Sequence, residues 1–333
     1  MVTRPEGGKH GRLPVIVIAG PTASGKSALG LAVAEAFGGT IVNADSIQVY
    51  RELEILSARP GPAELARAPH RLYGVLSAAE RCSAARWRAL ALDEIAAAQG
   101  AAQGAGRLPV LVGGTGFYLR ALLDGLSPIP DIPAEIRAAA LGRMAALGAP
   151  AFHAELGRRD PAMAARLAPA DRQRLVRAWE VLEATGRSLA DWQREPAVAA
   201  GEGPALAPLC FVLEPPRPAL YAACDARFRA MVDAGALAEA ERLARLGLDP
   251  NLPAMKAVGV PELIAHLRGE MALEAAIAAA QQATRRYAKR QLTWFRHQMA
   301  GAERLRPGGV GAQFMERLQP SIFAFIRQFL LTL

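Results

Sequence analysis

Short apolar segments alternate with segments of helical periodicity along the first third of the chain. The apolar segments are mostly β-branched and carry few polar positions, which is typical of strands buried on both sides of a parallel sheet. We predict strands at 14–19, 40–44, 72–76 and 109–112, and helices at 28–37 and 83–99. This alternation predicts an α/β fold, a doubly wound parallel sheet with helices on both faces.

The pattern changes at the proline-rich segment 127–133, after which the next strand is predicted only at 209–213. In between, helical spacing prevails, and it is clearest at 172–185. Further helices are predicted from 217 to 299, so we expect a helical domain inserted into the α/β core. The expected parts are a disordered basic arm at 1–12, the first part of the core at 13–127, a tRNA-contacting insertion at 128–205, the return to the core with basic helices at 206–300, and a tail at 301–333.

The composition is that of a globular protein. Of the 333 residues, 52% are hydrophobic, so the chain can bury a core, and disordered and collagen-like classes are excluded. The three cysteines are far apart and form no disulfide framework, which favours a reducing compartment. The apolar segment 322–333 is too short to cross a bilayer, which needs about 20 residues. We expect a soluble, cytoplasmic monomer with no membrane partner.

The residues after the first predicted strand form a phosphate-binding motif. They fit the pattern GxxxxGKS/T and lie between a buried strand and a helix, as this motif requires. In such a P-loop the backbone amides and the helix N-terminus face an anion, the lysine reaches the same phosphates, and the final hydroxyl binds Mg²⁺. We predict that a diphosphate or nucleotide binds at Gly20, Pro21, Thr22, Ala23, Ser24, Gly25, Lys26 and Ser27, with Ser27 as the Mg²⁺ ligand.

Asp45 is the acidic residue expected beside this phosphate. P-loop enzymes that hydrolyse nucleotides usually have a metal-binding carboxylate at the end of a later core strand. Here the predicted strand 109–112 is followed by Gly113-Gly114-Thr115, with no carboxylate. Asp45 follows the second strand directly, at the sheet edge where ligands bind in such folds. A turn or helix-capping role is the structural alternative. A carboxylate at this position favours group transfer to an acceptor that loses a proton, a layout that small-molecule and nucleoside kinases share.

The positive charge is concentrated near the C-terminal end. Lys and Arg number 39 against 31 Asp and Glu, a net charge of +8, and residues 285–306 hold seven of the cations but one carboxylate. On a helix, Arg286 and Arg290 lie on one stripe, with aromatic residues interleaved. A solvated basic face is the structural alternative. Together with a second basic cluster at 172–177, this density favours a nucleic-acid acceptor.

Seven segments spread over the chain form an ordered set. They read GPTASGKS at 20–27, VNADSIQVYRELEI at 42–55, PHRLYGV at 69–75, SAARWR at 83–88, LPVLVGGTGFYLRALLDGL at 108–126, DRQRLVRAWEVLEATGRSL at 171–189 and ATRRYAKRQLTWFR at 283–296. In this order they resemble the blocks of the tRNA dimethylallyltransferase (tRNA isopentenyltransferase) family. The resemblance extends from about Leu13 to Gln298. A P-loop alone does not identify a family, whereas seven blocks in this order do.

The resemblance implies transfer of a dimethylallyl group from dimethylallyl diphosphate to the exocyclic amine of the adenosine at position 37 of tRNA, in the anticodon stem-loop. It implies that the P-loop, Lys26, Arg227 and Mg²⁺ bind the diphosphate and stabilise it as the leaving group, and that Asp45 is the general base. The family's tRNA contacts map to Asp45, Ser46, Ile47, Gln48, Thr115, Arg137, Gln173, Arg174, Leu175, Val176, Arg177 and Lys256. The basic stripe adds Arg286 and Arg290.

The chain departs from the family pattern at three places. Ser27 stands where many members have threonine, and the segment 57–60 reads SARP where TAKP is usual. The segment 259–261 reads Gly-Val-Pro where Gly-Tyr-Arg is common, which removes the polar side chains expected to contact RNA there. None of these departures removes a proposed catalytic group.

Two other functional classes share the P-loop. One is a kinase that uses ATP, which does not need the basic face at 285–306. The other is a nucleotide-gated RNA-binding protein or ATPase, which is disfavoured by the missing strand-end carboxylate and by the position of Asp45.

Overall fold

A parallel sheet forms the centre of the core. The computed structural model describes residues 12–100, 106–195 and 205–333, and within these ranges six strands pair in the order β3-β2-β4-β1-β5-β6, all parallel. The strands are β1 Leu13–Ala19, β2 Thr40–Asn43, β3 His70–Arg71, β4 Pro109–Gly113, β5 Leu206–Leu213 and β6 Glu303–Leu305. The α/β sheet predicted from the sequence is confirmed.

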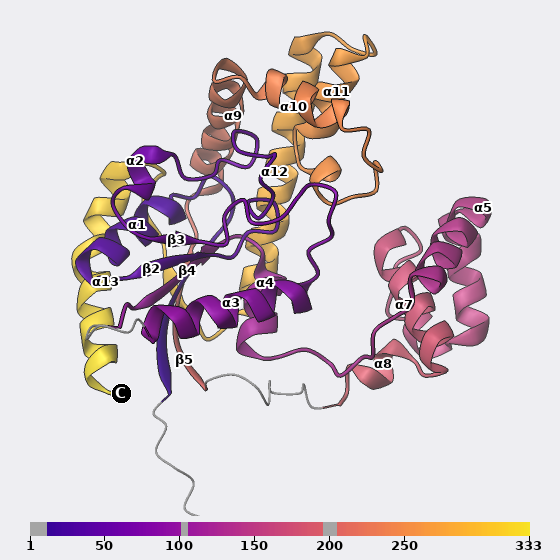
Figure 1. Ribbon diagram of the computed structural model, residues 1–333, viewed down its shortest axis with the longest axis horizontal. Helices are drawn as coiled ribbons and strands as arrows, with labels where there is room; N and C mark the ends of the chain where they lie inside the picture. The colour runs from indigo at the N-terminus through magenta and orange to yellow at the C-terminus, as the bar shows by residue number, and fades with distance from the viewer. Residues whose placement is uncertain (1–11, 101–105, 196–204) are drawn as a thin grey trace, which may run out of the picture. The chain divides into compact units, whose positions relative to one another are not determined.

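Helices cover both faces of this sheet (Figure 1). Those of the core are α1 Lys26–Ala36, α2 Pro62–Leu65, α3 Ala84–Gln99, α4 Gly116–Leu123, α9 Arg217–Asp233, α10 Ala236–Arg245, the 3-10 helix Ala254–Lys256, α11 Val260–Leu267, α12 Leu273–Gln298 and α13 Ala312–Leu331. Side chains alternate along a strand, so consecutive residues of β1 serve opposite faces. Ile16 and Ile18 pack with α1 and α13, whereas Val15 and Val17 pack with α3, α4 and α9 to α12. All four are fully buried, and each contributes about 1.5–3 kcal/mol to folding.

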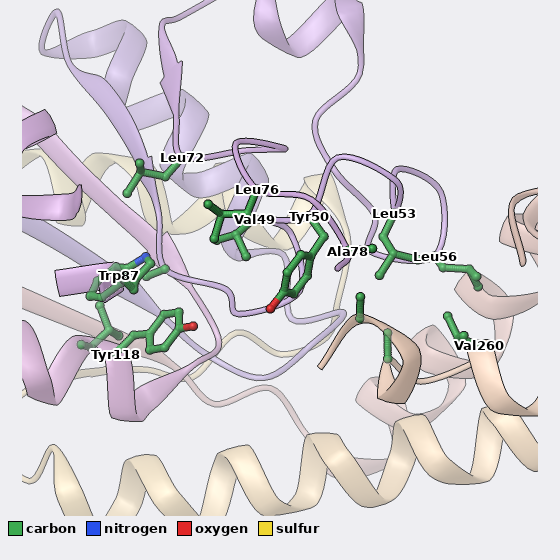
Figure 2. Close-up of a cluster of buried hydrophobic side chains, with 14 of the residues drawn as sticks. Val49, Tyr50, Leu53, Leu56, Leu72, Leu76, Ala78, Trp87, Tyr118 and Val260 are labelled. Carbon is green, nitrogen blue, oxygen red and sulfur yellow. The ribbon is translucent and has the colours of Figure 1, made fainter. Parts of the chain in front are cut away.

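A group of buried apolar side chains supports the chain segment that follows β2 (Figure 2). It includes Val49, Tyr50, Leu53 and Leu56 from this segment, packed in the same cluster as Trp87 and Tyr118, whose rings stack with centroids 4.7 Å apart. The buried carboxylate of Glu239 on α10 accepts hydrogen bonds from three successive backbone amides of this segment, 54–56, at 2.8–2.9 Å. The packing and these hydrogen bonds therefore hold the chain directly after residues 45–48 in a fixed conformation.

The helices between α4 and β5 form a second compact unit. The core unit comprises 1–123 and 203–333, and the second unit comprises 124–202. The helices of the second unit are α5 Ala134–Arg159, α6 Pro161–Ala164, α7 Arg172–Thr185 and α8 Leu189–Trp192. Phe152 and Trp179 pack within its own hydrophobic core. The expected helical insertion corresponds to this unit, while the expected arm at 1–12 lies outside the described residues except for Arg12.

The prediction of a strand at 72–76 is wrong. Pairing with β2 is confined to His70 and Arg71. Leu72 and Gly74 have left-handed φ values of 64° and 62°, so the chain turns where the strand was expected to continue. The apolar character of this segment serves the core instead, because Leu72 is buried there.

Two elements at the C-terminal end were not predicted. β6 has the sequence Glu-Arg-Leu, which lacks an apolar run, and it adds to the sheet edge beside β5. In the tail, α13 lies against α1 (yellow in Figure 1) and buries Met315, Ile322 and Ile326. None of the helices in the described ranges, α13 included, has the length and apolar character to cross a bilayer.

Candidate active site

The loop from Gly20 to Ser27, called the phosphate loop below, joins β1 to α1. Ala23 and Gly25 have left-handed φ values of 61° and 91°, a conformation that glycine adopts without strain. A Cβ atom on Gly20 would lie 2.9 Å from Ser24 Oγ and 3.1 Å from Leu213 Cβ, so the close packing at the start of the loop requires glycine. The loop has the strand–turn–helix arrangement that its sequence motif requires.

Two half-buried cations lie at this loop. Lys26 Nζ donates a hydrogen bond to the Pro21 carbonyl at 3.2 Å, and Arg227 of α9 donates through Nη2 to Thr22 Oγ1. Burial lowers the pKa of Lys26 to about 8; the charge of Arg227 acts in the same direction and that of Asp45 opposes it. Burial also lowers the pKa of Arg227, but a guanidinium stays protonated at neutral pH. Thr22 and Arg227 are 205 positions apart in the sequence, and the fold brings them together.

Asp45 lies directly beyond β2, on a turn held by Asn43. The buried Asn43 side chain accepts a hydrogen bond from the Asp45 amide at 2.8 Å and donates one to the Leu72 carbonyl at 3.0 Å. Asp45 Oδ1 accepts from the Ile47 amide at 2.9 Å. Asp45 therefore has the turn role that the sequence offered as the structural alternative, and this role uses one carboxylate oxygen. The residue also lines a pocket.

Thr115 connects the ends of β2 and β4 beside Asp45. Its amide donates to the Ala44 carbonyl at 3.1 Å, and its Oγ1 accepts from the Ser46 amide at 2.9 Å. A Cβ atom on Gly113 would lie 2.1 Å from the Ala44 carbonyl oxygen, so this approach requires glycine. Ser46 and Thr115, both predicted to contact tRNA, thus lie side by side.

Gln291 of α12 reaches the phosphate loop, and sequence reasoning missed it. Its side chain is 5% exposed. The Oε1 atom accepts from the Thr22 amide at 2.8 Å, and the Nε2 atom donates to the Gly114 carbonyl at 2.9 Å. The available signal was a glutamine at a position where the helical periodicity places the buried face.

Tyr287, also on α12 and also missed, lines the pocket next to Asp45. Burial, followed by the charge of Asp45, raises the pKa of Tyr287, and a hydrogen bond with Thr115 opposes the shift. The phenol is therefore neutral at physiological pH and serves this site as a hydrogen-bonding group.

A pocket with about 580 Å³ of empty space, including its open side, lies beside these groups. Its polar lining includes Thr22, Asp45 and Arg227. Its apolar lining consists of Ile47, Leu56, Cys224, Phe228, Met231, Ala257 and Val258. The pocket suits a ligand that has both an anionic group and an apolar chain.

Ser27, the predicted Mg²⁺ ligand, is exposed in the first turn of α1 and lines a smaller, separate pocket with Glu64, His70 and Tyr73. Among the described residues, His, Cys, Asp and Glu side chains form no cluster of three that could hold a metal ion. Mg²⁺ often takes one or two protein oxygens and completes its shell with phosphate oxygens and water. A single hydroxyl next to a bound diphosphate therefore fits this cation.

Of the other residues of the core unit predicted to contact tRNA, Gln48 uses its side-chain nitrogen for hydrogen bonds within the protein. Its Nε2 atom donates to the carbonyls of Ser57 and Ala58 at 3.0 and 2.8 Å. Lys256 is exposed. Val260, in the segment that departs from the family pattern, is fully buried and has no side chain available to RNA.

The basic stretch 285–306 is partly neutralised by carboxylates from elsewhere in the chain. Glu214, just beyond β5, lies 3.3–3.7 Å from Arg296, Arg304 and Arg306. Arg285 pairs with Asp225 of α9 in the same way. Counting charges along the sequence therefore overestimated the free charge of this stretch.

The stripe predicted to contact RNA is nevertheless on the surface. Arg286, Lys289 and Arg290 are exposed on α12. The Arg290 guanidinium lies 5.6 Å from the ring centroid of Tyr287, so one side of this exposed group faces the pocket lining. The same helix therefore has a basic outer face and an inner face that contributes to the site.

In the second unit the predicted tRNA contacts divide into two groups. The exposed or half-exposed ones are Arg137, Gln173, Arg174 and Arg177. Leu175 and Val176 are buried in the core of the unit, because the helix turns these two positions inward, and their predicted contact with tRNA stays a prediction. Arg137 and Arg177 lie 3.6 and 3.5 Å from the buried Glu180.

Comparison with protein families gives matches over most of the chain. The family model described as IPP transferase matches residues 48–298, and that described as isopentenyl transferase matches residues 13–78. A tRNA dimethylallyltransferase from Rhodospirillum centenum (strain ATCC 51521 / SW) is 62% identical over 295 residues, 89% of this chain and 92% of the relative. One from Paramagnetospirillum magneticum (strain ATCC 700264 / AMB-1) is 55% identical over 319 residues, 96% of this chain and 98% of the relative.

Two solved structures have a similar fold. The full-length tRNA isopentenylpyrophosphate transferase from Bacillus halodurans has a TM-score of 0.67 and 29% identity, over 96% of this chain and 97% of that one. A eukaryotic dimethylallyltransferase, described as acting on tRNA, has a TM-score of 0.72 and 25% identity, over 88% of this chain and 74% of that one.

Proposed function

This chain belongs to the tRNA dimethylallyltransferase family, and from that premise we propose that it transfers a dimethylallyl group from dimethylallyl diphosphate to the exocyclic amine of the adenosine at position 37 of tRNA. Membership makes it an enzyme, a prenyltransferase that modifies tRNA. The observation that carries the detailed proposal is the pocket whose lining combines Thr22 of the phosphate loop, the Arg227 guanidinium, the Asp45 carboxylate and apolar side chains.

The donor binds with its diphosphate at the phosphate loop. Lys26 and Arg227 offset the negative charge that develops on the diphosphate as the bond from the allylic carbon to oxygen breaks. The five-carbon chain lies against the apolar lining, where each buried methylene contributes about 0.8 kcal/mol. The same lining keeps water away from the reactive allylic carbon.

The acceptor amine approaches Asp45. The lone pair of an exocyclic adenine amine is delocalised into the ring, so the amine is a weak nucleophile. Asp45 accepts an amine proton as the new nitrogen–carbon bond forms, and diphosphate leaves with the electron pair of the broken carbon–oxygen bond. The adenosine must leave its base stack to reach this carboxylate, at a cost of a few kcal/mol.

Mg²⁺ is the proposed cofactor, held by Ser27 together with oxygens of the diphosphate. When bound, it adds positive charge beside the leaving group. The anticodon stem-loop is the proposed partner, and Ser46, Thr115 and the exposed stripe of Arg286 and Arg290 are its proposed contacts in the core unit. We further propose that the protein works as a monomer in the cytoplasm.

A transfer assay tests the proposal. The protein is incubated with Mg²⁺ and unmodified tRNA, and with either dimethylallyl diphosphate or ATP. We expect the mass of the RNA to rise by one dimethylallyl group with the prenyl donor alone, and the modified nucleoside to map to position 37. Turnover of ATP without alkylation of the RNA would instead indicate the kinase or ATPase alternatives and overturn the proposal.

A further inference from the structure

We propose that Gln291 is a positioning residue that holds the phosphate loop in its binding conformation through the Thr22 amide. Gln291 is not among the residues that line the pocket proposed to bind the donor. Its side chain instead connects two backbone groups, the Thr22 amide and the Gly114 carbonyl, that belong to loops following β1 and β4. The proposal rests on the proposed function in one respect, namely that the loop binds the diphosphate of the donor.

The chemistry of the two contacts selects glutamine. Thr22 presents a donor and Gly114 presents an acceptor, so the residue between them must offer both. An amide side chain has an acceptor and a donor in one planar group, whereas a carboxylate lacks the donor and an ammonium lacks the acceptor. Because Gln291 is 5% exposed, water does not readily replace either contact.

The packing around the amide supports a fixed geometry. A Cβ atom on Gly114 would lie 2.2 Å from Gln291 Nε2 and 3.2 Å from the Gly20 carbonyl oxygen. Glycine at position 114 thus makes room for the glutamine amide next to the first residue of the phosphate loop. The two loops and the side chain between them have little freedom to shift independently.

The contact with Thr22 determines which groups of the loop face a ligand. Pro21 has no amide hydrogen, the Thr22 amide is already bonded to Gln291, and the Ser24 amide donates to the Pro21 carbonyl at 3.3 Å. The amides left for a diphosphate after Thr22 are therefore those of Ala23, Gly25, Lys26 and Ser27. The Thr22 hydroxyl in turn accepts a hydrogen bond from Arg227. Gln291 therefore acts on both the loop amides and the arginine through one residue, Thr22.

The test compares Gln291→Met, which keeps the length of the side chain and removes both polar contacts, with Gln282→Met at an exposed position of the same helix. Binding of inorganic pyrophosphate is measured by calorimetry, and the KM for each substrate and kcat by the transfer assay. We expect Gln291→Met to raise the Kd for pyrophosphate and the KM for the prenyl donor about tenfold, the effect of one net hydrogen bond, with the KM for tRNA unchanged. Gln282→Met should match the unsubstituted protein.

The outcomes separate this inference from the proposed function. If the unsubstituted protein does not bind pyrophosphate, the proposed donor site is overturned and this inference with it. If it binds pyrophosphate and Gln291→Met binds it equally well, the inference alone is overturned. Equal losses for pyrophosphate and tRNA, together with a lower Tm, would make Gln291 a general packing residue and would also overturn it.

A second measurement needs no variant. In amide hydrogen exchange of the unsubstituted protein, the Thr22 amide should exchange slowly before pyrophosphate is added, whereas the amides of Ala23 and of Gly25 to Ser27 should slow only after its addition. A Thr22 amide that exchanges rapidly until pyrophosphate is present would contradict the proposed contact, even if Gln291→Met failed to fold.

Discussion

At the scale of single residues, the candidate site depends on side chains that hold backbone turns as well as on those that face a ligand. Asn43 fixes the turn after β2, Thr115 ties that turn to the end of β4, and Gln291 ties the end of β4 to the phosphate loop. Such hydrogen bonds to main-chain atoms keep the reactive groups in place before substrate arrives, which is a requirement for efficient catalysis. Asp45 and Lys26 are the groups placed in this way.

Asp45→Asn should separate binding from chemistry. The asparagine can still accept the hydrogen bond from the Ile47 amide, so the turn is retained, but it cannot accept a proton. We expect kcat to fall about a hundred- to ten-thousandfold, the usual contribution of a general base. Affinities for tRNA and pyrophosphate, measured on the same preparation, should stay close to those of the unsubstituted enzyme. Undiminished turnover would exclude the general-base role.

Lys26 should make donor binding depend on pH. Burial lowers its pKa to about 8, so the free enzyme increasingly holds a neutral amine above this pH. A bound anion favours the ammonium form, so the Lys26 pKa rises on binding, protons are taken up, and affinity falls by up to about tenfold per pH unit above the pKa of the free enzyme. Calorimetry of pyrophosphate binding in buffers of different ionisation enthalpy measures this uptake.

Lys26→Arg is the matched control for the pH experiment. A guanidinium stays protonated throughout the range, so the contribution of this residue to proton uptake should vanish, while the titration of pyrophosphate itself is common to both proteins. The same proton uptake in both proteins would mean that Lys26 does not titrate in this range.

At the scale of elements, α12 has two distinct faces. Its inner face contributes Tyr287 and Gln291 to the candidate site, and its outer face carries Arg286 and Arg290. A helix is a rigid element, so side chains on its two faces keep a fixed spacing. The helix therefore contributes residues both to the proposed donor site and to the proposed tRNA contacts.

Charge reversal on the outer face should weaken RNA binding. We expect the double substitution of Arg286 and Arg290 by Glu to lower tRNA affinity at least about tenfold and to reduce the dependence of affinity on salt, because fewer phosphate contacts release fewer counterions. Pyrophosphate binding should be unaffected. Filter binding over a range of salt concentrations measures both quantities.

The control for this experiment is Arg317→Glu, on the exposed side of α13. It makes the same kind of charge change away from the helix that borders the pocket. If the control weakened tRNA binding as much per charge as the double substitution, the basic stripe would be an ordinary solvated face.

At the scale of the whole molecule, the chain forms two units, each with a core of its own. The phosphate loop, Asp45, Arg227 and Gln291 all belong to the unit of 1–123 and 203–333. The second unit, 124–202, contributes proposed RNA contacts only, among them Arg137 and Arg174. The proposed donor site is therefore complete within one unit.

Replacing residues 124–202 by a flexible linker of about twelve glycine and serine residues should test this division. We expect the shortened chain to fold and to bind pyrophosphate within about threefold of the full chain, because every proposed diphosphate contact is retained. Transfer to tRNA should be lost. Loss of pyrophosphate binding in a folded, monodisperse protein would show that the donor site needs the second unit.

Local pattern was sufficient for most of the fold. β1, β4 and α7 are where the apolar spacing predicts them, since each forms from a continuous segment with a clear period. The strand predicted at 72–76 failed because Leu72 adopts a left-handed turn, and β6 was missed because Glu303 and Arg304 do not resemble a strand. Both exceptions depend on neighbours in space, which a local pattern does not contain.

The sequence by itself determined the phosphate-binding motif, the carboxylate at the end of β2 and the family to which the chain belongs, because each is a matter of residue type and spacing along the chain. Tertiary structure alone decided that Arg227 meets Thr22, that Gln291 connects the phosphate loop to Gly114, and that Glu214 neutralises part of the basic stretch. Each of these contacts joins residues that are far apart in the sequence. Their meeting depends on how helices pack on the sheet and on the pairing of β6 with β5, and no periodicity within one segment records either.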